Sequence, residues 1–142
     1  MARLEAEFLE GNRVIFSARG RSFVNARETL PDGPIGYSSG ELLLIALANC
    51  SLGILTNHEL MKDVPIRRCK VVLDSEGESN PSRITSISAV VELEVDEVAL
   101  AERRDTLERA INHCPVGNTL RFSPEVTIQL NIKTPEAAAI RP

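Results

Sequence analysis

The sequence SSGELLLIALANCSLGILTNHELM, residues 38–61, decides the fold of this chain. Its first half is apolar on nearly every side, and Pro65 prevents a helix from continuing much further. We therefore predict one long helix over Ser39–Met61, which neighbouring elements must cover all round. Ser38 and Glu41 fit a capping box, in which a serine oxygen and a glutamate carboxylate satisfy the unpaired backbone donors of the first turn.

Alternating apolar and polar residues predict strands on both sides of this helix, at residues 3–8, 14–18, 22–26, 68–74, 86–95 and 126–133. Glycine and proline residues predict a loop over residues 31–40, and the connection from residue 74 to 83 suits a hairpin with a long loop. A second helix is predicted from Glu97 to His113, with Asp96 as its N-cap.

This order of elements predicts an α+β fold in which a mostly antiparallel sheet packs on helices, as a single domain over residues 1–142. One small sheet can cover only one side of a helix that is apolar all round. We therefore expect a homodimer, in which a second copy of the chain covers the other side of the long helix.

Composition narrows the classes of function. The 142 residues carry a formal net charge of −4, which disfavours binding to nucleic acid or to an anionic membrane. The apolar run is interrupted by Asn49 and Ser51 and falls short of about 20 residues, so a buried helix is expected rather than a membrane span. The first residues lack the apolar stretch of a signal peptide, which predicts a cytoplasmic protein with reduced cysteines.

The three cysteines differ in their surroundings. Cys50 lies within the apolar helix, where a buried, unreactive thiol is the commoner outcome. Cys114 precedes Pro115, so it is either the N-cap of a short helix that favours its thiolate or part of a simple corner. Cys69 falls on the apolar face of a strand and is expected in the core. The spacings contain no zinc knuckle, so no metal and no cofactor are expected.

Two motifs together resemble the OsmC/Ohr family, named for osmotically induced protein C and organic hydroperoxide resistance. Residues 40–50, GELLLIALANC, are similar to the family's P-x-E-L-L-L-A-A-L-A-x-C helix, and residues 114–120, CPVGNTL, to its C-P-V-x-x-T-L motif. The resemblance covers nearly the whole chain. It implies an intertwined α+β homodimer with active sites at the subunit interface. It also implies thiol-dependent reduction of organic hydroperoxides in defence against oxidative stress.

The resemblance assigns roles to two cysteines. It implies that Cys50 is the peroxidatic thiol, which becomes a sulfenic acid as the hydroperoxide is reduced to an alcohol. It implies that Cys114 is the resolving thiol, which condenses with the sulfenic acid to a disulfide that an external dithiol then reduces. A thiolate in an apolar helix needs electrostatic support, so an arginine and a carboxylate are expected beside Cys50.

The supporting residues depart from the family pattern. The best-known members have a catalytic glutamate ten residues before the cysteine, where this chain has Gly40, and the motif's proline is replaced by Ser39. Glu41 fits a more divergent branch, and both a catalytic role and a purely capping role stay open for it. Arg27 is predicted to supply the guanidinium, with other candidates in Arg13, Arg19 and Arg21.

Two further functions stay open at this level. A non-catalytic dimer of the same fold would bind a small apolar ligand, with Cys50 merely lining the pocket. A purely structural dimer would use its cysteines only as core residues.

Overall fold

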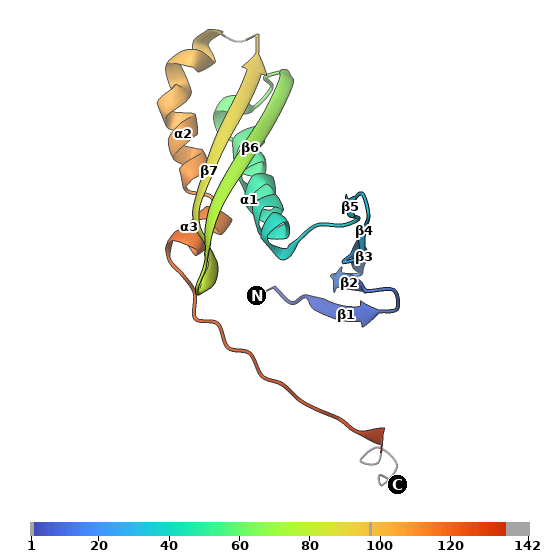
Figure 1. Cartoon of the computed structure of the whole chain (residues 1–142). Coiled ribbons are helices and arrows are strands. Elements are labelled where there is room, and N and C mark those ends of the chain that lie inside the picture. Colours follow the sequence, from blue (N-terminus) through green and yellow to red (C-terminus); the bar gives the residue numbers. More distant parts are fainter. Residues whose placement is uncertain (1, 97, 136–142) are drawn as a thin grey trace.

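The computed structural model describes residues 2–96 and 98–135 and has the predicted α+β fold (Figure 1). The chain begins with five strands, β1 (Glu5–Leu9), β2 (Arg13–Ala18), β3 (Arg21–Ala26), β4 (Thr29–Leu30) and β5 (Gly33–Pro34). They are followed by α1 (Ser39–Thr56), the 3-10 helix η1 (Glu59–Met61) and the strands β6 (Ile66–Ser79) and β7 (Ser82–Val95). The last elements are the 3-10 helix η2 (Val98–Arg103), α2 (Arg104–Asn112) and α3 (Pro115–Arg121).

The N-terminal strands form a small antiparallel sheet in the order β1-β2-β3, as the alternation of residues predicts. The rings of Phe16 and Phe23 stack across β2 and β3, with centroids 5.1 Å apart. Asn25 is buried on β3, and its side chain both donates to and accepts from the backbone of Tyr37 at 2.9 Å. These two bonds tie the sheet to the segment that leads into α1.

The strands β6 and β7 form a longer hairpin than the sequence predicts. The expected loop from residue 74 to 83 is wrong, because pairing continues to Ser79 and Ser82 and leaves only two residues between the strands. Gly77 permits this continuation, since a Cβ there would lie 2.9 Å from the carbonyl oxygen of Arg83 on the opposite strand. An ion pair between Arg83 and Glu78 also links the two strands near the turn.

The long helix ends earlier than predicted, at Thr56 rather than Met61. The side chain and the backbone N–H of Asn57 both donate to the carbonyl of Gly53, which closes the last turn. His58 then accepts a hydrogen bond from the backbone of Leu60 and caps η1. Polar side chains that bond to nearby backbone thus replace the last turn of the predicted helix.

The start of α1 is as predicted, with a complete capping box. The backbone N–H of Ser38 donates to the Glu41 carboxylate at 2.7 Å, and the N–H of Glu41 donates to the Ser38 hydroxyl at 3.2 Å. By length and composition alone α1 would suffice to span a membrane, and only 11% of its residues are buried. It packs on β6, α2 and α3 along one side.

The second predicted helix is divided. Residues 98–103 form η2, the α-helix begins only at Arg104, and Glu97 lies outside the described residues. The carboxylate of Asp96 does not cap this helix but pairs with Arg67 at 2.9 Å. The core lies between these helices and the hairpin, and its buried side chains are Leu55, Met61, Leu100 and Leu107.

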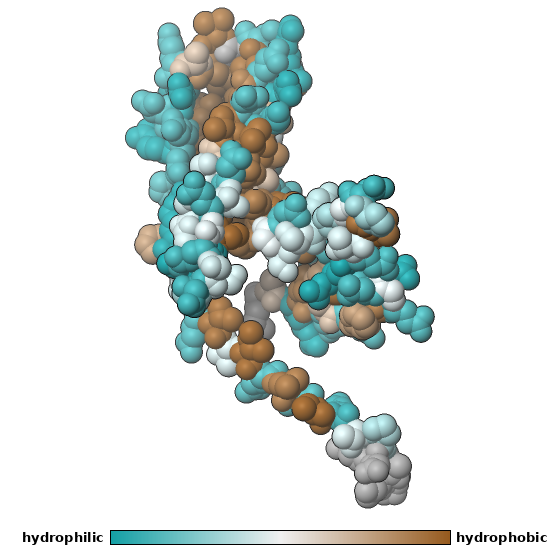
Figure 2. Space-filling view, viewed as in Figure 1, coloured by the Kyte–Doolittle hydropathy of each residue, from teal (hydrophilic) through white to brown (hydrophobic). Residues whose placement is uncertain are grey.

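The last predicted strand, residues 126–133, is not a strand in the described part of the single chain. The segment runs away from the body as an extended tail that carries alternating apolar side chains (Figures 1 and 2). Between 74% and 89% of each apolar side chain is exposed, at Val126, Ile128, Leu130 and Ile132. The alternation is that of a strand, but a strand needs a neighbour, and no segment within residues 2–96 and 98–135 pairs with it.

Candidate active site

The fold brings together the two cysteines that the motifs single out. Cys50 lies on α1, Cys114 lies just before α3, and α1 packs against α3. The two thiols lie near enough for each to influence the pKa of the other, and the hydroxyl of Ser51 and the N–H of Val116 lie near them. Cys114 is 1% exposed and Cys50 is half-buried, and both are free thiols.

Cys114 is the N-cap of α3, as one of the two sequence-based readings predicts. Its backbone is extended, Pro115 occupies the first helical position, and its sulfur accepts a hydrogen bond from the N–H of Gly117 at 3.1 Å. Proline suits this position because its ring presets the helical φ and it lacks an N–H to satisfy. The local sequence thus aims backbone donors at the sulfur.

The two thiols differ in acidity. Burial raises the pKa of the Cys50 thiol, the N–H of Val116 lowers it, and the neighbouring Cys114 raises it further. Burial also acts to raise the pKa of Cys114, but hydrogen bonds from Gly117, Cys50, Ser51 and Val116 outweigh it and leave that pKa below its ordinary value. Within one chain the negative charge is therefore favoured on Cys114 rather than on Cys50.

Gly117 is the point at which the site is most tightly packed. A Cβ at Gly117 would lie 3.3 Å from the sulfur of Cys114, 3.5 Å from Nη1 of Arg121 and 3.7 Å from Cδ1 of Leu47. A thiol, a guanidinium and the apolar wall of α1 therefore converge on this glycine. Sequence reasoning missed Arg121, although it follows Cys114 by seven residues, which is about two helical turns and places both on one side of α3.

Two cavities open beside this cluster. The first holds about 580 Å³ between α1, β7 and α3, and its lining includes Leu43, Leu47 and Leu120, with Arg121 as its one charged lining residue. The second is larger and is lined by Cys114 and Ser51 together with core side chains of β7 and α2. Cys50 lines neither cavity among the described residues.

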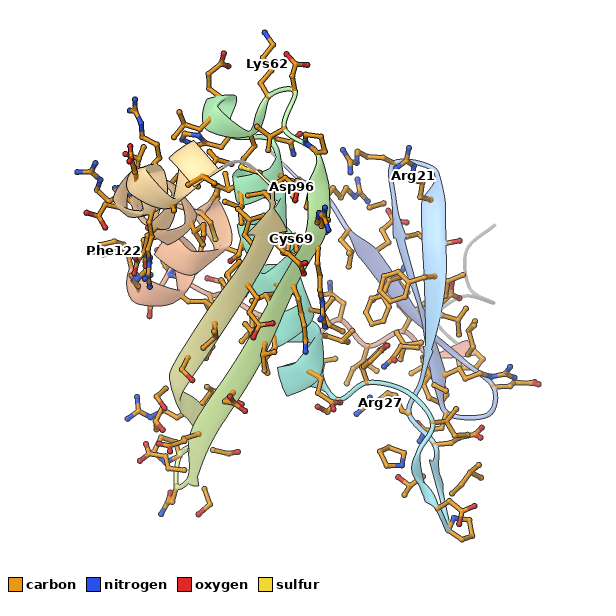
Figure 3. The ribbon with its side chains drawn as sticks, turned by 90° about the horizontal axis from the view of Figure 1, so that it is seen from above. Arg21, Arg27, Lys62, Cys69, Asp96 and Phe122 are labelled. Atoms are coloured by element: carbon orange, nitrogen blue, oxygen red, sulfur yellow. The ribbon has the colours of Figure 1, made fainter. Side chains whose placement is uncertain are left out.

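The predicted supporting residues, Glu41 and Arg27, are not beside Cys50 within one chain. The Glu41 carboxylate accepts a hydrogen bond from the backbone of Ser38. Glu41 itself lies nine residues before Cys50, which is about 13 Å along the helix axis. Arg27 is exposed beyond the end of β3, and Figure 3 shows it and Arg21 on the N-terminal sheet rather than among the helices. Their catalytic roles remain predictions.

The remaining candidates have structural partners. Cys69 packs against the core from β6, as predicted. Nδ1 of His113 lies 2.7 Å from the carbonyl oxygen of Arg109, so this ring nitrogen must carry a proton to bond there. Over residues 2–96 and 98–135, no group of three or more His, Cys, Asp or Glu side chains is arranged to hold a metal ion.

Comparison with known proteins gives the family. The family model described as "OsmC-like protein" matches residues 31–129, which include α1, the hairpin and both cysteine motifs. This chain belongs to the OsmC-like protein family. No curated protein sequence matches this OsmC-like protein.

Solved structures show the same fold. An OsmC-like protein from Mycoplasma pneumoniae is 16% identical, with a TM-score of 0.70 over 87% of this chain and 89% of that chain. A hypothetical protein from Aquifex aeolicus is 18% identical, with a TM-score of 0.63 over 87% and 89%. The organic hydroperoxide resistance protein OhrB of Bacillus subtilis is 13% identical, with a TM-score of 0.52 over 87% and 92%.

Proposed function

We propose that this OsmC-like protein is a cytoplasmic thiol peroxidase that reduces organic hydroperoxides to alcohols. The observation that carries the proposal is the proximity of the thiols of Cys50 and Cys114, which come from separate elements and lie near each other where α1 packs on α3. Two neighbouring free thiols can be joined by a disulfide after local movement, which is what a peroxidatic and a resolving cysteine require.

The reaction has three steps. The Cys50 thiolate attacks the outer oxygen of the hydroperoxide, the O–O bond breaks, and the alkoxide takes a proton and leaves as an alcohol. Cys50 is then a sulfenic acid, oxidised by two electrons. The Cys114 thiolate attacks that sulfur and releases water, which forms the disulfide, and an external dithiol reduces it. The lowered pKa of Cys114 suits the second step, because the resolving thiol also reacts as a thiolate.

The first step requires a positive charge, and no cation among residues 2–96 and 98–135 lowers the pKa of Cys50 within one chain. Burial raises the pKa of Cys50 and opposes its ionisation. A guanidinium beside the sulfur would reverse this effect. We therefore propose that the active unit is a homodimer in which Arg27 of a second copy reaches Cys50.

The exposed surface supports this assembly. The chain exposes 12058 Å², whereas a compact monomer of its mass exposes roughly 7,200 Å². Over two chains this excess is more than the total of about 2,000–5,000 Å² that many obligate homodimers bury, so the chain has ample surface for such an interface. Exposed large apolar residues occur on several elements, among them the N-terminal sheet, α1 and the C-terminal tail, including Phe8, Phe23, Leu43, Ile45, Ile128 and Leu130.

The proposal is tested by peroxide consumption. With cumene hydroperoxide and a dithiol donor, the wild-type protein should consume peroxide, and Cys50→Ser should abolish turnover. Cys69→Ser is the matched control, since Cys69 packs in the core away from the pair and its loss should leave turnover in place. Cys114→Ser should still release alcohol once but leave Cys50 over-oxidised, which mass spectrometry detects. Unchanged turnover by Cys50→Ser would end the proposal.

One observation favours a second function. The raised pKa of Cys50 and the apolar lining of the first cavity also suit a dimer that binds a small apolar ligand without catalysis. In that case the wild-type protein would not consume peroxide. It would instead bind an apolar probe equally well with Cys50→Ser, because Cys50 does not line the first cavity within one chain.

A further inference from the structure

The C-terminal end of α2 explains how the Cys114 corner is held. An α-helix leaves its last four carbonyl groups without partners inside the helix. The corner itself serves the first three of these four carbonyls, through the contacts His113 Nδ1···Arg109 O, His113 N–H to Ala110 O and Cys114 N–H to Ile111 O. The fourth carbonyl, that of Asn112, depends on a side chain from the next helix, Arg121.

Both terminal nitrogens of the Arg121 guanidinium donate hydrogen bonds to Asn112. Nη1 donates to the backbone carbonyl oxygen of Asn112 at 2.7 Å, and Nη2 donates to its side-chain oxygen at 3.1 Å. Nη1 also lies 3.5 Å from the side-chain oxygen of Asn118, whose backbone N–H donates to the carbonyl oxygen of Cys114 at 2.9 Å. This two-pronged geometry is specific to arginine, because a lysine ammonium has no planar fork.

These hydrogen bonds link residues that precede Cys114 in the sequence to residues that follow it. Asn112 and Asn118 lie on either side of Cys114, and Arg121 contacts both of them from the far end of α3. The same guanidinium approaches the place where a Gly117 side chain would be, and so does the Cys114 sulfur. A cation that holds the last carbonyl of α2 also interacts favourably with the negative end of that helix.

We propose that Arg121 is the positioning residue of Cys114: its guanidinium joins the end of α2 to α3 and so holds the Cys114 sulfur facing Cys50. Arg121 touches neither the peroxide nor the reacting atoms in this role. The inference depends on the proposed function for its importance in turnover, but the geometry is tested without any peroxide.

The first test measures disulfide formation by diamide, which takes two electrons and two protons from a pair of thiols. In a Cys69→Ser background, only Cys50 and Cys114 remain. Arg121→Gln should slow formation of their disulfide about five- to tenfold, the effect of losing about one or two net hydrogen bonds. Arg109→Gln is the matched control, since it removes the same charge from an exposed side chain of α2, and it should leave the rate unchanged.

The second test distinguishes the two-pronged hydrogen bonding of the Arg121 guanidinium from its positive charge. Arg121→Lys keeps the positive charge but not the two-pronged grip, so its disulfide rate should stay close to that of Arg121→Gln. In a Cys50→Ser, Cys69→Ser background, the ultraviolet absorbance of the thiolate reports Cys114 alone. There, Arg121→Gln should move the titration of Cys114 to higher pH, because a displaced sulfur loses the N–H of Gly117, and Arg109→Gln should not.

Three outcomes would overturn the proposal: a wild-type disulfide rate in Arg121→Gln, equal slowing by Arg109→Gln, or full rescue by lysine. Asn112→Ala removes the side-chain acceptor of Nη2, together with an exposed hydrogen bond from Nδ2 to the Glu108 carbonyl oxygen, and keeps the backbone acceptor of Nη1. It should slow the reaction in the same direction by less, so it tests the proposal if Arg121→Gln does not fold. A wild-type protein that forms the disulfide with diamide but consumes no peroxide would refute the peroxidase and leave the role of Arg121 intact.

Discussion

Gly117 shows how little room the site leaves at the scale of one residue. It occupies the third position of α3, where alanine is ordinarily preferred to glycine by about 0.5–1 kcal/mol. A Cβ there would lie closer to the Cys114 sulfur than side chains normally approach, and Arg121 blocks relaxation on the other side. The glycine is thus explained by contact with the thiol rather than by its backbone angles.

Gly117→Ala should therefore raise the pKa of Cys114. The added methyl must push the sulfur away from its 3.3 Å position and lengthen its hydrogen bond from the Gly117 N–H. The titration of the Cys114 thiolate, followed by ultraviolet absorbance with Cys50→Ser and Cys69→Ser, should move to higher pH. Gly40→Ala is the control, because a Cβ at Gly40 would meet only ordinary contacts at 3.8 Å and beyond. An unmoved titration in Gly117→Ala would contradict this account.

Single residues also show which part of the site the sequence could predict. The cap at Cys114 follows from a local rule, since Pro115 marks the first position of a helix. The part played by Arg121 depends on the angle between α2 and α3, which no local pattern specifies, so its contact with Asn112 needed the structure. The proximity of Cys50 and Cys114 was implied only by the family resemblance. The two residues are far apart in the sequence, and no local pattern relates their positions in the fold.

At the scale of the elements, the sequence predicted the start of α1 and the end of α2 correctly, but not the end of α1 or the start of α2. The capping box is a local signal, because Ser38 and Glu41 lie within four residues and bond to each other's backbone. The end of α1 was decided by Asn57 and His58, whose side chains offer the backbone other partners. The N-cap predicted at Asp96 failed because the same carboxylate pairs with Arg67, which is distant in sequence.

The cap of α1 gives a pH-dependent prediction. The backbone N–H of Ser38, and then its hydroxyl, lower the pKa of the Glu41 carboxyl. Such a group binds its proton more weakly in the folded chain, so its stabilisation is present above the ordinary glutamate pKa, about 4.3, and is lost as the pH falls through the lower folded value. Urea unfolding should thus show Glu41→Gln less stable than wild type at neutral pH.

The difference between the two proteins should disappear in acid. Glu102→Gln, at an exposed position on η2, serves as the control and should show no loss of stability at neutral pH. If Glu41→Gln and wild type unfold alike at neutral pH, the capping carboxylate contributes nothing. If Glu41→Gln also loses turnover in the peroxide assay without losing stability, the catalytic role predicted for Glu41 is favoured over the capping role.

At the scale of the whole molecule, the exposed apolar tail is best understood as a strand without its neighbour. The sequence predicted a strand there, and the alternation of its residues is real, but pairing depends on a partner that a single chain lacks. The exposed apolar residues of α1 and of the N-terminal sheet support the same interpretation. Local patterns could predict these elements, whereas in the proposed homodimer their burial depends on assembly, and this would account for the disagreement between the sequence and the single chain at this segment.

Substitutions along the tail test this interpretation directly. If the tail pairs with a second copy, one face of the strand is buried and the other faces solvent, so alternate residues should respond differently. Ile128→Asp places a charge on the apolar face and should convert a dimer into a monomer, whereas Gln129→Asp, its neighbour on the polar face, should leave the dimer intact. Sedimentation equilibrium measures both masses against the 15.6 kDa of one chain. A monomeric wild-type protein, or equal responses to the two substitutions, would show that the tail is not an interface strand. The peroxidase would then need its guanidinium from within one chain, where Arg27 is not beside Cys50.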